Sequence, residues 1–373
     1  MPPRLTPRLL IIPLLLSLFC PSSAIRSFPN KTIFDESNMV SGNDFMKSPV
    51  YENGPECPVS TEKYNPVSLA SAREACDNRF LVHVAMTLDE EYLRGSIAAV
   101  HSVLKHTSCP DNVYFHFIAS DSNSPTPNEL TRIVESTFPS LAFKVYAFDE
   151  RPIRKLISSS IRKALDNPLN YARSYLSDII DKCVDRVIYL DSDVVVVDDI
   201  RKLWSIPLTG SRVIGAPEYC QANFTRYFSG EFWSDHELPK VFDGRKRPCY
   251  FNTGVMVMDL GKWREGGYVA KIEKWMEVQK ERRIYDLGSL PPFLLAFAGD
   301  VQPIHHRWNQ HGLGGHNVLS SCRPLHPGPV SLLHWSGKGK PWKRLDEGNP
   351  CPVDQLWAPY DLYRPSSRHQ EQR

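Results

Sequence analysis

The sequence predicts an α/β fold with a mixed, mainly parallel sheet that carries helices on both of its faces. Two observations support this class. Apolar runs of strand length lie at 81–86, 113–119, 143–148 and 186–190. Segments with helical spacing of apolar residues separate several of these runs, and such β-α-β order connects parallel strands through helices that cover both faces of the sheet.

The expected elements follow one another from about residue 80. A helix over 93–104 is predicted because apolar residues recur there every three or four positions. These residues are Leu93, Ile97, Val100 and Leu104. We expect a second helix over 171–183, which runs into the strand at 186–190. Shorter strands at 213–216, 255–258 and 331–335 are expected to extend the same continuous sheet.

Length and charge set further bounds. A chain of 373 residues with 42% hydrophobic side chains can bury a full core. Lys and Arg number 44 and Asp and Glu number 42, so the net charge of +2 provides no basic excess that would favour nucleic acid. We place a short stem at 25–75, the folded domain at 76–365 and a polar tail at 366–373.

The first 24 residues have the pattern of a secretory leader. Arg4 and Arg8 precede a short apolar run at 9–20, and the small residues Ser22 and Ala24 follow it. This pattern predicts a signal peptide cleaved after Ala24, and a retained type II membrane anchor is the alternative. In both cases the rest of the chain lies in the lumen of the secretory pathway.

Sequons and cysteines agree with a luminal location. Asn30 and Asn223 each begin an Asn-x-Thr sequon, so we expect an N-glycan at Asn223 and, in second place, at Asn30. Without Cys20, which lies in the leader, eight cysteines remain, an even number that suits disulfides in an oxidising compartment. Buried free thiols are the alternative, and the pairing is not readable from the sequence.

Two carboxylates stand where the strand at 186–190 ends. They are Asp191 and Asp193, with Ser192 between them. Ligands of such sheets bind at the carboxyl ends of the strands. Carboxylates crowded at the end of a buried strand repel each other and lose hydration, so a divalent cation such as Mg²⁺ or Mn²⁺ is the natural compensator. The alternative is a solvated turn that caps the next helix.

A second segment of interest runs from His334 to Trp342. A neutral ring nitrogen of His334 can share the cation, and Gly337 with Lys340, in a loop expected to face solvent, suits a diphosphate. Trp335 and Trp342 suit either a sugar-stacking face or core packing. His311 and His316, which lie among glycines, are assigned no role.

The pattern Asp191-Ser192-Asp193, followed by His334-x-x-Gly337-x-x-Lys340, resembles glycosyltransferase family eight, a retaining family with the GT-A fold. The likeness covers about 80–360. Residues 250–260 resemble the family's Phe-Asn-Ser-Gly-Val segment, and residues 285–292 with the short stem resemble the plant galacturonosyltransferase-like branch. The resemblance implies a nucleotide-sugar-binding domain of GT-A type.

The resemblance also implies a role for each matching residue. Asp191, Asp193 and His334 would hold Mn²⁺ against the diphosphate of a UDP-sugar. The residues implied in donor binding are Thr87, Asp89, Tyr92, Arg173, Ser192, Gly337 and Lys340. The implied catalytic residues are Asn252, Asp286 and Lys340. The sequence departs from glycogenin-like members at Leu287, where those carry a Gln near the anomeric carbon, so the residue that acts there is not identified.

The implied function is transfer of a hexuronosyl unit, in first place galacturonosyl, from a UDP-sugar to pectin or xylan in the Golgi. Alternatives are UDP-galactose or UDP-glucose as donor, the endoplasmic reticulum as location, and a non-catalytic scaffold in a complex with other glycosyltransferases. A strand followed by Asp-x-Asp also resembles haloacid-dehalogenase phosphatases, where the first Asp is a nucleophile. That motif usually opens its domain, whereas about 110 folded residues precede Asp191 here.

Overall fold

The structure is a computed structural model and describes residues 44–58, 75–76, 79–122, 124–161, 163–314 and 322–364. The predicted leader, Asn30, His316 and the polar tail lie outside these residues. None of the described helices is long and apolar enough to cross a membrane.

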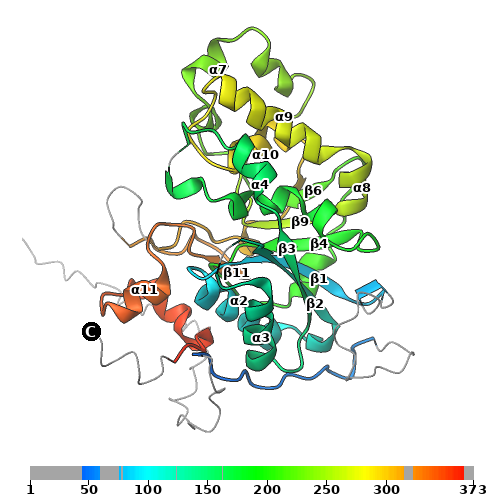
Figure 1. Cartoon of the computed structure of the whole chain (residues 1–373), viewed down its shortest axis with the longest axis vertical. Helices are drawn as coiled ribbons and strands as arrows, with labels where there is room; N and C mark the ends of the chain where they lie inside the picture. Colours follow the sequence, from blue (N-terminus) through cyan, green and yellow to red (C-terminus); the bar gives the residue numbers. More distant parts are fainter. Residues whose placement is uncertain are drawn as a thin grey trace, which may run out of the picture. The chain divides into compact units, whose positions relative to one another are not determined.

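A seven-stranded sheet forms the core of the described residues, in the order β10-β6-β9-β4-β1-β2-β3 (Figure 1). Its strands are β1 (Val82–Leu88), β2 (Val113–Ser120), β3 (Ala142–Phe148), β4 (Arg186–Leu190), β6 (Ile214–Ala216), β9 (Val255–Asp259) and β10 (Gln302–Pro303). β9 is antiparallel to both of its neighbours, and the other pairs are parallel. The mixed, mainly parallel sheet predicted from the sequence is confirmed.

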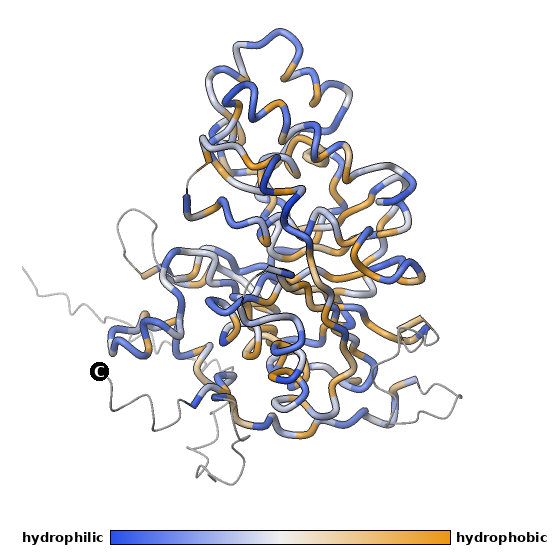
Figure 2. The backbone as a smooth tube through the Cα atoms, viewed as in Figure 1, coloured by the Kyte–Doolittle hydropathy of each residue, from blue (hydrophilic) through white to orange (hydrophobic). Residues whose placement is uncertain are grey.

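The two faces of the sheet are covered by different sets of helices because side chains alternate along each strand. Val187 and Tyr189 of β4 belong to one buried cluster, and Ile188 and Leu190 belong to another. The helices that pack into the first cluster are α4 (Arg151–Leu156), α5 (Leu176–Ile179), α7 (Gly230–Ser234), α8 (Leu260–Glu265), α9 (Tyr268–Glu281) and α10 (Leu290–Phe297). Those in the second are α2 (Leu93–His106), α3 (Pro127–Thr137) and α6 (Ile200–Trp204). Figure 2 shows the hydrophobic colour concentrated along the central strands.

The predicted helix at 93–104 is confirmed as α2, but the predicted helix at 171–183 is wrong. A 3₁₀ segment, Pro168–Ser174, and the single turn of α5 occupy this region. The carbonyl oxygen of Ser177 accepts hydrogen bonds from the side chains of Lys182 and Arg264, at 2.8 and 2.9 Å. These side chains cap the carbonyl that a longer helix would have bonded to a backbone N–H, so the helix ends early.

Two short antiparallel pairs stand apart from the main sheet. β5 (Val194–Val196) pairs with β11 (Leu332–His334), and β7 (Glu218–Tyr219) pairs with β8 (Tyr250–Phe251). The strand predicted at 331–335 therefore exists, but the prediction that it extends one continuous sheet is wrong. The chain turns between β4 and β5, and β11 pairs with β5 beyond that turn. The short helix α11 (Pro341–Asp346) and several 3₁₀ turns are the remaining elements of the described residues.

All eight cysteines outside the leader form disulfides, so the alternative of free thiols is wrong. The pairs are Cys57–Cys109, Cys76–Cys183, Cys220–Cys249 and Cys322–Cys351. The segment 44–58 lies within the range predicted as a stem, and it packs on the folded domain. Phe45 is buried and forms a β-bridge with Tyr363.

Candidate active site

The candidate site forms at the carboxyl end of β4, next to the end of β1. Asp191 follows β4 directly, and its backbone N–H donates to the carbonyl of Gly254, just before β9, at 2.8 Å. The hydroxyl of Ser192 donates to the carbonyl of Thr87 in β1 at 3.0 Å. The turn that carries both carboxylates is thus fixed to two neighbouring strands, as expected for a ligand site in such a sheet.

The β5–β11 pair brings His334 to this turn from about 140 residues further along the chain. In the antiparallel register His334 lies opposite Val194, the residue after Asp193. The backbone N–H of Trp335 donates to the carbonyl of Asp193 at 2.9 Å and continues this pairing. The backbone ladder therefore fixes the position of His334 beside both aspartates.

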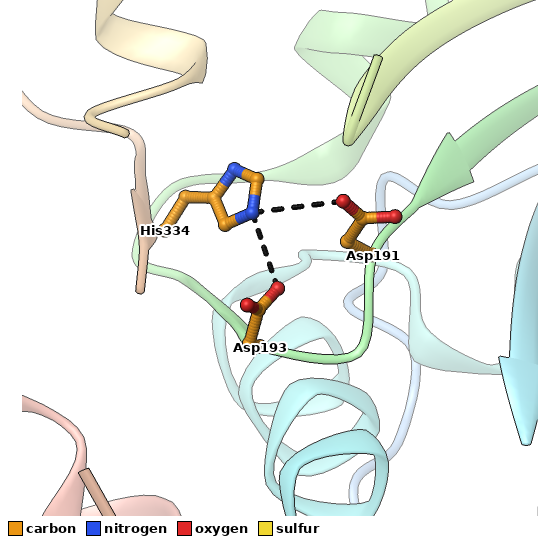
Figure 3. Close-up of side chains that lie close together, drawn as sticks. All are labelled: Asp191, Asp193 and His334. Atoms are coloured by element: carbon orange, nitrogen blue, oxygen red, sulfur yellow. Dashed lines mark ion pairs between the residues drawn. The ribbon is translucent and has the colours of Figure 1, made fainter. Parts of the chain in front are cut away.

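Asp191, Asp193 and His334 converge on one point (Figure 3). Nε2 of His334 lies 3.1 Å from Oδ1 of Asp193 and 3.7 Å from Oδ2 of Asp191. The three ligand atoms all lie within 4.8 Å of one another. His334 and Asp193 are buried, and Asp191 is partly exposed, so the point of convergence is accessible from one side.

The hydrogen bonds behind His334 determine its tautomer. Oδ1 of Asn252 accepts from the backbone N–H of Gly254 at 2.9 Å and from Nδ2 of Asn309 at 3.1 Å. Asn309 must then present Oδ1 to Nδ1 of His334, at 3.0 Å, and Nδ1 carries the proton. Nε2 is left with its lone pair directed at the two carboxylates, and this buried nitrogen has no hydrogen-bond partner among the described residues.

This arrangement fits a divalent cation. A neutral imidazole nitrogen and two carboxylate oxygens aimed at one another repel unless a positive ion lies between them. Gly254 leaves room for this convergence because a Cβ at that position would collide with Oδ2 of Asp191 and Cε1 of His334. The group could therefore hold a metal, with one oxygen from each aspartate and Nε2 of His334 as ligands.

Two buried cations neutralise the remaining carboxylate oxygens. Nη2 of Arg173 lies 3.0 Å from Oδ1 of Asp191, and Nζ of Lys340 lies 2.5 Å from Oδ2 of Asp193. Burial by itself raises the pKa of Asp193, but the ammonium of Lys340 outweighs it and holds this pKa well below its ordinary value. Both aspartates therefore keep one oxygen on a cation and turn the other toward His334.

The prediction that Lys340 faces solvent is wrong, because the residue is only 7% exposed. Its ammonium also donates to the carbonyl of Trp335 at 2.8 Å and lies 5.3 Å from the centre of the Tyr92 ring. The loop after β11 folds back over the site and carries Lys340 inward. Trp335 and Trp342 are buried in a hydrophobic cluster with Trp357, so they pack in the core.

The other predicted donor-binding residues lie around this centre. Asp89 accepts the backbone N–H of Tyr92 at 2.8 Å, and burial raises the pKa of Asp89. The backbone N–H of Gly337 donates to the carbonyl of Leu313 at 3.1 Å, so it is engaged within the protein. Asn252 belongs to the His334 network through Asn309.

Asp286 is not brought to the site by any contact between described residues. It forms an ion pair with Arg283 at 2.7 Å, and the side chains of both residues are half or more exposed. Its catalytic role stays a prediction.

Three residues of the site were missed by the sequence analysis: Asn309, Thr253 and Tyr189. Thr253 accepts from Nη1 of Arg173 through its carbonyl at 3.0 Å, and the hydroxyl of Tyr189 donates to Oδ1 of Asp191 at 3.0 Å. His311, assigned no role, is partly buried near His334, and the loss of hydration lowers its pKa to about 3. These polar residues lie in or beside apolar segments, and only their tertiary contacts distinguish them.

Comparison with known proteins identifies the family. A family model described as glycosyl transferase family 8 matches residues 83–346. The chain belongs to glycosyltransferase family 8. As a member of this family it is a retaining glycosyltransferase that uses a UDP-sugar donor. This excludes the alternative of a haloacid-dehalogenase phosphatase.

Relatives of the chain cover most of its length. It is 64% identical over 345 residues to probable galacturonosyltransferase-like 9 of Arabidopsis thaliana, covering 92% of this chain and 87% of the relative. It is 67% identical over 320 residues to probable galacturonosyltransferase-like 8 of the same plant, covering 86% and 81%. The chain thus resembles the plant galacturonosyltransferase-like members of the family, as the sequence predicted.

Solved structures support the fold. The galactosyltransferase LgtC in complex with donor and acceptor sugar analogues aligns with a TM-score of 0.56 and 21% identity, over 78% of this chain and 99% of that one. An LgtC active-site mutant aligns with a TM-score of 0.57 and 19% identity, with the same coverage. The predicted GT-A fold is confirmed.

Proposed function

We propose that this family 8 enzyme transfers a galacturonosyl unit from UDP-galacturonate to pectin or xylan, with retention at the anomeric carbon. The observation that carries the proposal is the convergence of Asp191, Asp193 and His334, with Nε2 of His334 buried and unpartnered. The choice of sugar is supported by the names of the curated relatives in Arabidopsis thaliana. The choice of acceptor follows from the plant branch that the sequence resembles.

We assign Mn²⁺ to the site as the cation. The ligands would be Asp191, Asp193 and His334, a set of hard oxygens and one imidazole. Bound there, the ion supplies Lewis-acid stabilisation for the diphosphate of the donor as negative charge develops on it. Asn309 holds the ring of His334 in the tautomer that presents Nε2 to the centre.

The protein groups around the centre have separate tasks. Arg173 holds Asp191 by an ion pair and also contacts Thr253 next to Asn252, so its guanidinium orients one edge of the site. We assign Arg173 as the cation for the carboxylate of a uronate donor. Lys340 keeps Asp193 ionised, and its ammonium can turn toward the leaving diphosphate. We assign Thr87, Asp89 and Tyr92, at the end of β1, to the nucleoside.

We further propose a luminal Golgi location, with the leader either removed after Ala24 or kept as an anchor. Four disulfides support an oxidising compartment. Asn223 is exposed at the start of a 3₁₀ turn, which is compatible with an N-glycan. Partner glycosyltransferases in a complex belong to the same proposal.

The test is UDP release by the purified luminal protein with a panel of UDP-galacturonate, UDP-glucuronate, UDP-galactose and UDP-glucose. We expect turnover with UDP-galacturonate and an oligogalacturonide or xylan oligomer, its abolition by chelator and its restoration by Mn²⁺. Asp193→Ala should lose at least about a hundredfold in rate. Asp178→Ala, at an exposed aspartate of α5, is the control and should keep the rate.

Three outcomes would contradict the proposal. A neutral sugar as the preferred donor would exclude the galacturonosyl assignment, and full activity in chelator would exclude the metal. Absence of UDP binding in the presence of Mn²⁺ would exclude catalysis and favour the alternative of a non-catalytic scaffold.

A further inference from the structure

A cavity of about 640 Å³ lies between α9, α10 and the segment 241–246. Five basic residues line it: Arg212, Arg245, Lys246, Lys271 and Lys274. Tyr268 and Trp275 add aromatic rings, and Asp300 is the one acidic residue in this lining. The cavity is therefore strongly basic, although the whole chain carries a net charge of only +2.

The cavity lies away from the proposed metal centre. Leu190, next to Asp191, pairs with Val255 at the start of β9, and Ile214 of β6 pairs with Met258 near the end of β9. Arg212 comes two residues before Ile214, at the amino end of β6. It therefore lies at the opposite end of the strands from Asp191, which follows the carboxyl end of β4. Figure 1 shows α9 and α10 beside each other on the β6 side of the sheet. The basic cavity and the donor site are thus separated by the length of β9.

The wall of the cavity is fixed by internal contacts. Nη1 of Arg245 donates to the carbonyls of Leu295 and Ala296 near the end of α10, at 3.1 and 3.2 Å. Gly299 has a φ of +88° and allows the backbone of Lys246 to approach closely, because a Cβ would lie 2.5 Å from the carbonyl oxygen of Lys246. The segment 241–246 is therefore held against α10 without using the charges of the lysines.

Three lysines remain available for a ligand. Lys246, Lys271 and Lys274 are exposed, and none of them forms an ion pair with a carboxylate among the described residues. The ammonium of Lys271 lies 4.3 Å from the centre of the Tyr268 ring, so a cation and an aromatic face are presented together. Unpaired lysines in one concave surface repel each other and favour an anionic ligand.

We propose that this cavity binds an acidic carbohydrate chain, namely the part of the acceptor that lies away from its reacting end. This rests on the proposed function with pectin as the acceptor, because the galacturonate units of pectin carry carboxylates. The lysines match carboxylates repeated along such a chain, and the rings of Tyr268 and Trp275 match the apolar faces of sugar rings. A protein that holds the acceptor at two points keeps a long chain bound more tightly than a short one.

The binding test uses a long, purified oligogalacturonide titrated calorimetrically into the full luminal protein. Lys271→Glu/Lys274→Glu should weaken binding at least about tenfold, and added salt should weaken binding to the unmodified protein. Lys155→Glu/Lys280→Glu makes the same charge change at exposed lysines outside the cavity, on α4 and at the end of α9. This control should bind as the unmodified protein does.

The activity test separates this inference from the proposed function. With UDP-galacturonate as donor, the Lys271→Glu/Lys274→Glu protein should show a raised KM for the long acceptor and an unchanged KM for a galacturonate trimer. An unchanged KM for both acceptors, or equal affinities of the oligogalacturonide for all three proteins, would overturn the inference and leave the proposed function standing.

Two further outcomes are informative. No transfer from any donor would overturn the proposed function, while the binding titration would still decide whether the cavity takes an acidic chain. Binding of poly-glutamate or of a neutral galactan as tight as that of the oligogalacturonide would overturn the assignment of an acidic carbohydrate.

Discussion

At the scale of single residues, the centre depends on how each carboxylate divides its two oxygens. Arg173 and Tyr189 occupy Oδ1 of Asp191, and Lys340 occupies Oδ2 of Asp193. The other oxygen of each aspartate is left for a shared ligand. Because buried charges are costly unless paired, these contacts offset the cost of placing two carboxylates at the centre.

The first prediction concerns Asn309, a positioning residue that acts through His334. Asn309→Leu removes the acceptor of the Nδ1 proton, so the ring loses the constraint that presents Nε2 to the centre. We expect Mn²⁺ affinity to fall about 10- to 100-fold, measured by calorimetric titration without donor. Asn309→Asp keeps an acceptor oxygen and should retain most of the affinity. Unchanged Mn²⁺ affinity in a folded Asn309→Leu protein would contradict this role.

The second prediction concerns the space at Gly254. A Cβ there would collide with Asp191 and His334, so Gly254→Ala should displace both side chains and reduce Mn²⁺ binding at least about tenfold. Gly230→Ala is the matched control, because a Cβ at Gly230 meets nothing within 4 Å. Mn²⁺ titrations of both variants, with circular dichroism as a check of folding, would decide. Equal Mn²⁺ binding by the two variants would show that the space is not needed.

At the scale of elements, a buried chain of hydrogen bonds joins β1, β2 and β3. The hydroxyl of Tyr146 donates to Asp181, so it accepts the proton on Nδ1 of His116, at 3.0 Å. Nε2 of His116 must then accept the Nδ1 proton of His83, at 2.9 Å. Both imidazoles are neutral in this arrangement, and burial lowers the pKa of His83 to about 4 and that of His116 well below 6.5.

The third prediction is a loss of stability at acid pH. The unfolded chain protonates His83 near pH 6.5, whereas the folded chain does so only near pH 4. The unfolded state therefore binds more protons within this window, and the free energy of unfolding falls as the pH is lowered from 6.5 to 4. Each such histidine contributes a slope of at most about 1.4 kcal/mol per pH unit.

A variant can isolate this contribution. In the His83→Phe protein, the slope of the free energy of unfolding against pH should fall, between pH 6.5 and 4, by the contribution of about one bound proton. The substitution should also lower the free energy of unfolding by about 1–3 kcal/mol at pH 7, because Nε2 of His116 loses its donor. Urea unfolding at a series of pH values measures both quantities. A slope that is the same with and without His83 would contradict the assignment.

At the scale of the whole molecule, the segment 44–58 is joined to the domain at several points. The backbone N–H of Met46 donates to the carbonyl of Leu362, and that of Ser48 donates to the carbonyl of Thr137. The hydroxyl of Tyr51 bonds to His101 at 2.9 Å, and Cys57 is bonded to Cys109. This part of the chain therefore contributes to the stability of the fold.

The fourth prediction tests that contribution. Cys57→Ala/Cys109→Ala should lower the free energy of unfolding by about 2–4 kcal/mol, because the unfolded chain is no longer cross-linked across 52 positions. Transfer activity should persist, since neither cysteine contacts the metal centre. Urea unfolding of the oxidised proteins gives the first result, and UDP release gives the second. A free energy of unfolding equal to that of the unmodified protein would show that the hydrogen bonds alone hold the segment.

Much of the fold and of the site follows from the sequence. Apolar runs of strand length predicted β1, β2, β3 and β4, and helical spacing of apolar residues predicted α2. Asp191 and Asp193 were recognisable because carboxylates at the end of an apolar strand are costly without a partner. The motif with His334, Gly337 and Lys340 predicted the family that the comparisons confirm.

Only the tertiary structure decided how these parts meet. The helix predicted at 171–183 failed because the side chains of nearby Lys182 and distant Arg264 cap the carbonyl of Ser177, and β11 left the main sheet because it pairs with β5. That pairing places His334 beside Asp193, and the contacts of Asn309 fix the tautomer of His334. A sequence records which groups can form such contacts, but hydrogen bonds between residues far apart in the chain depend on distances that exist only after folding.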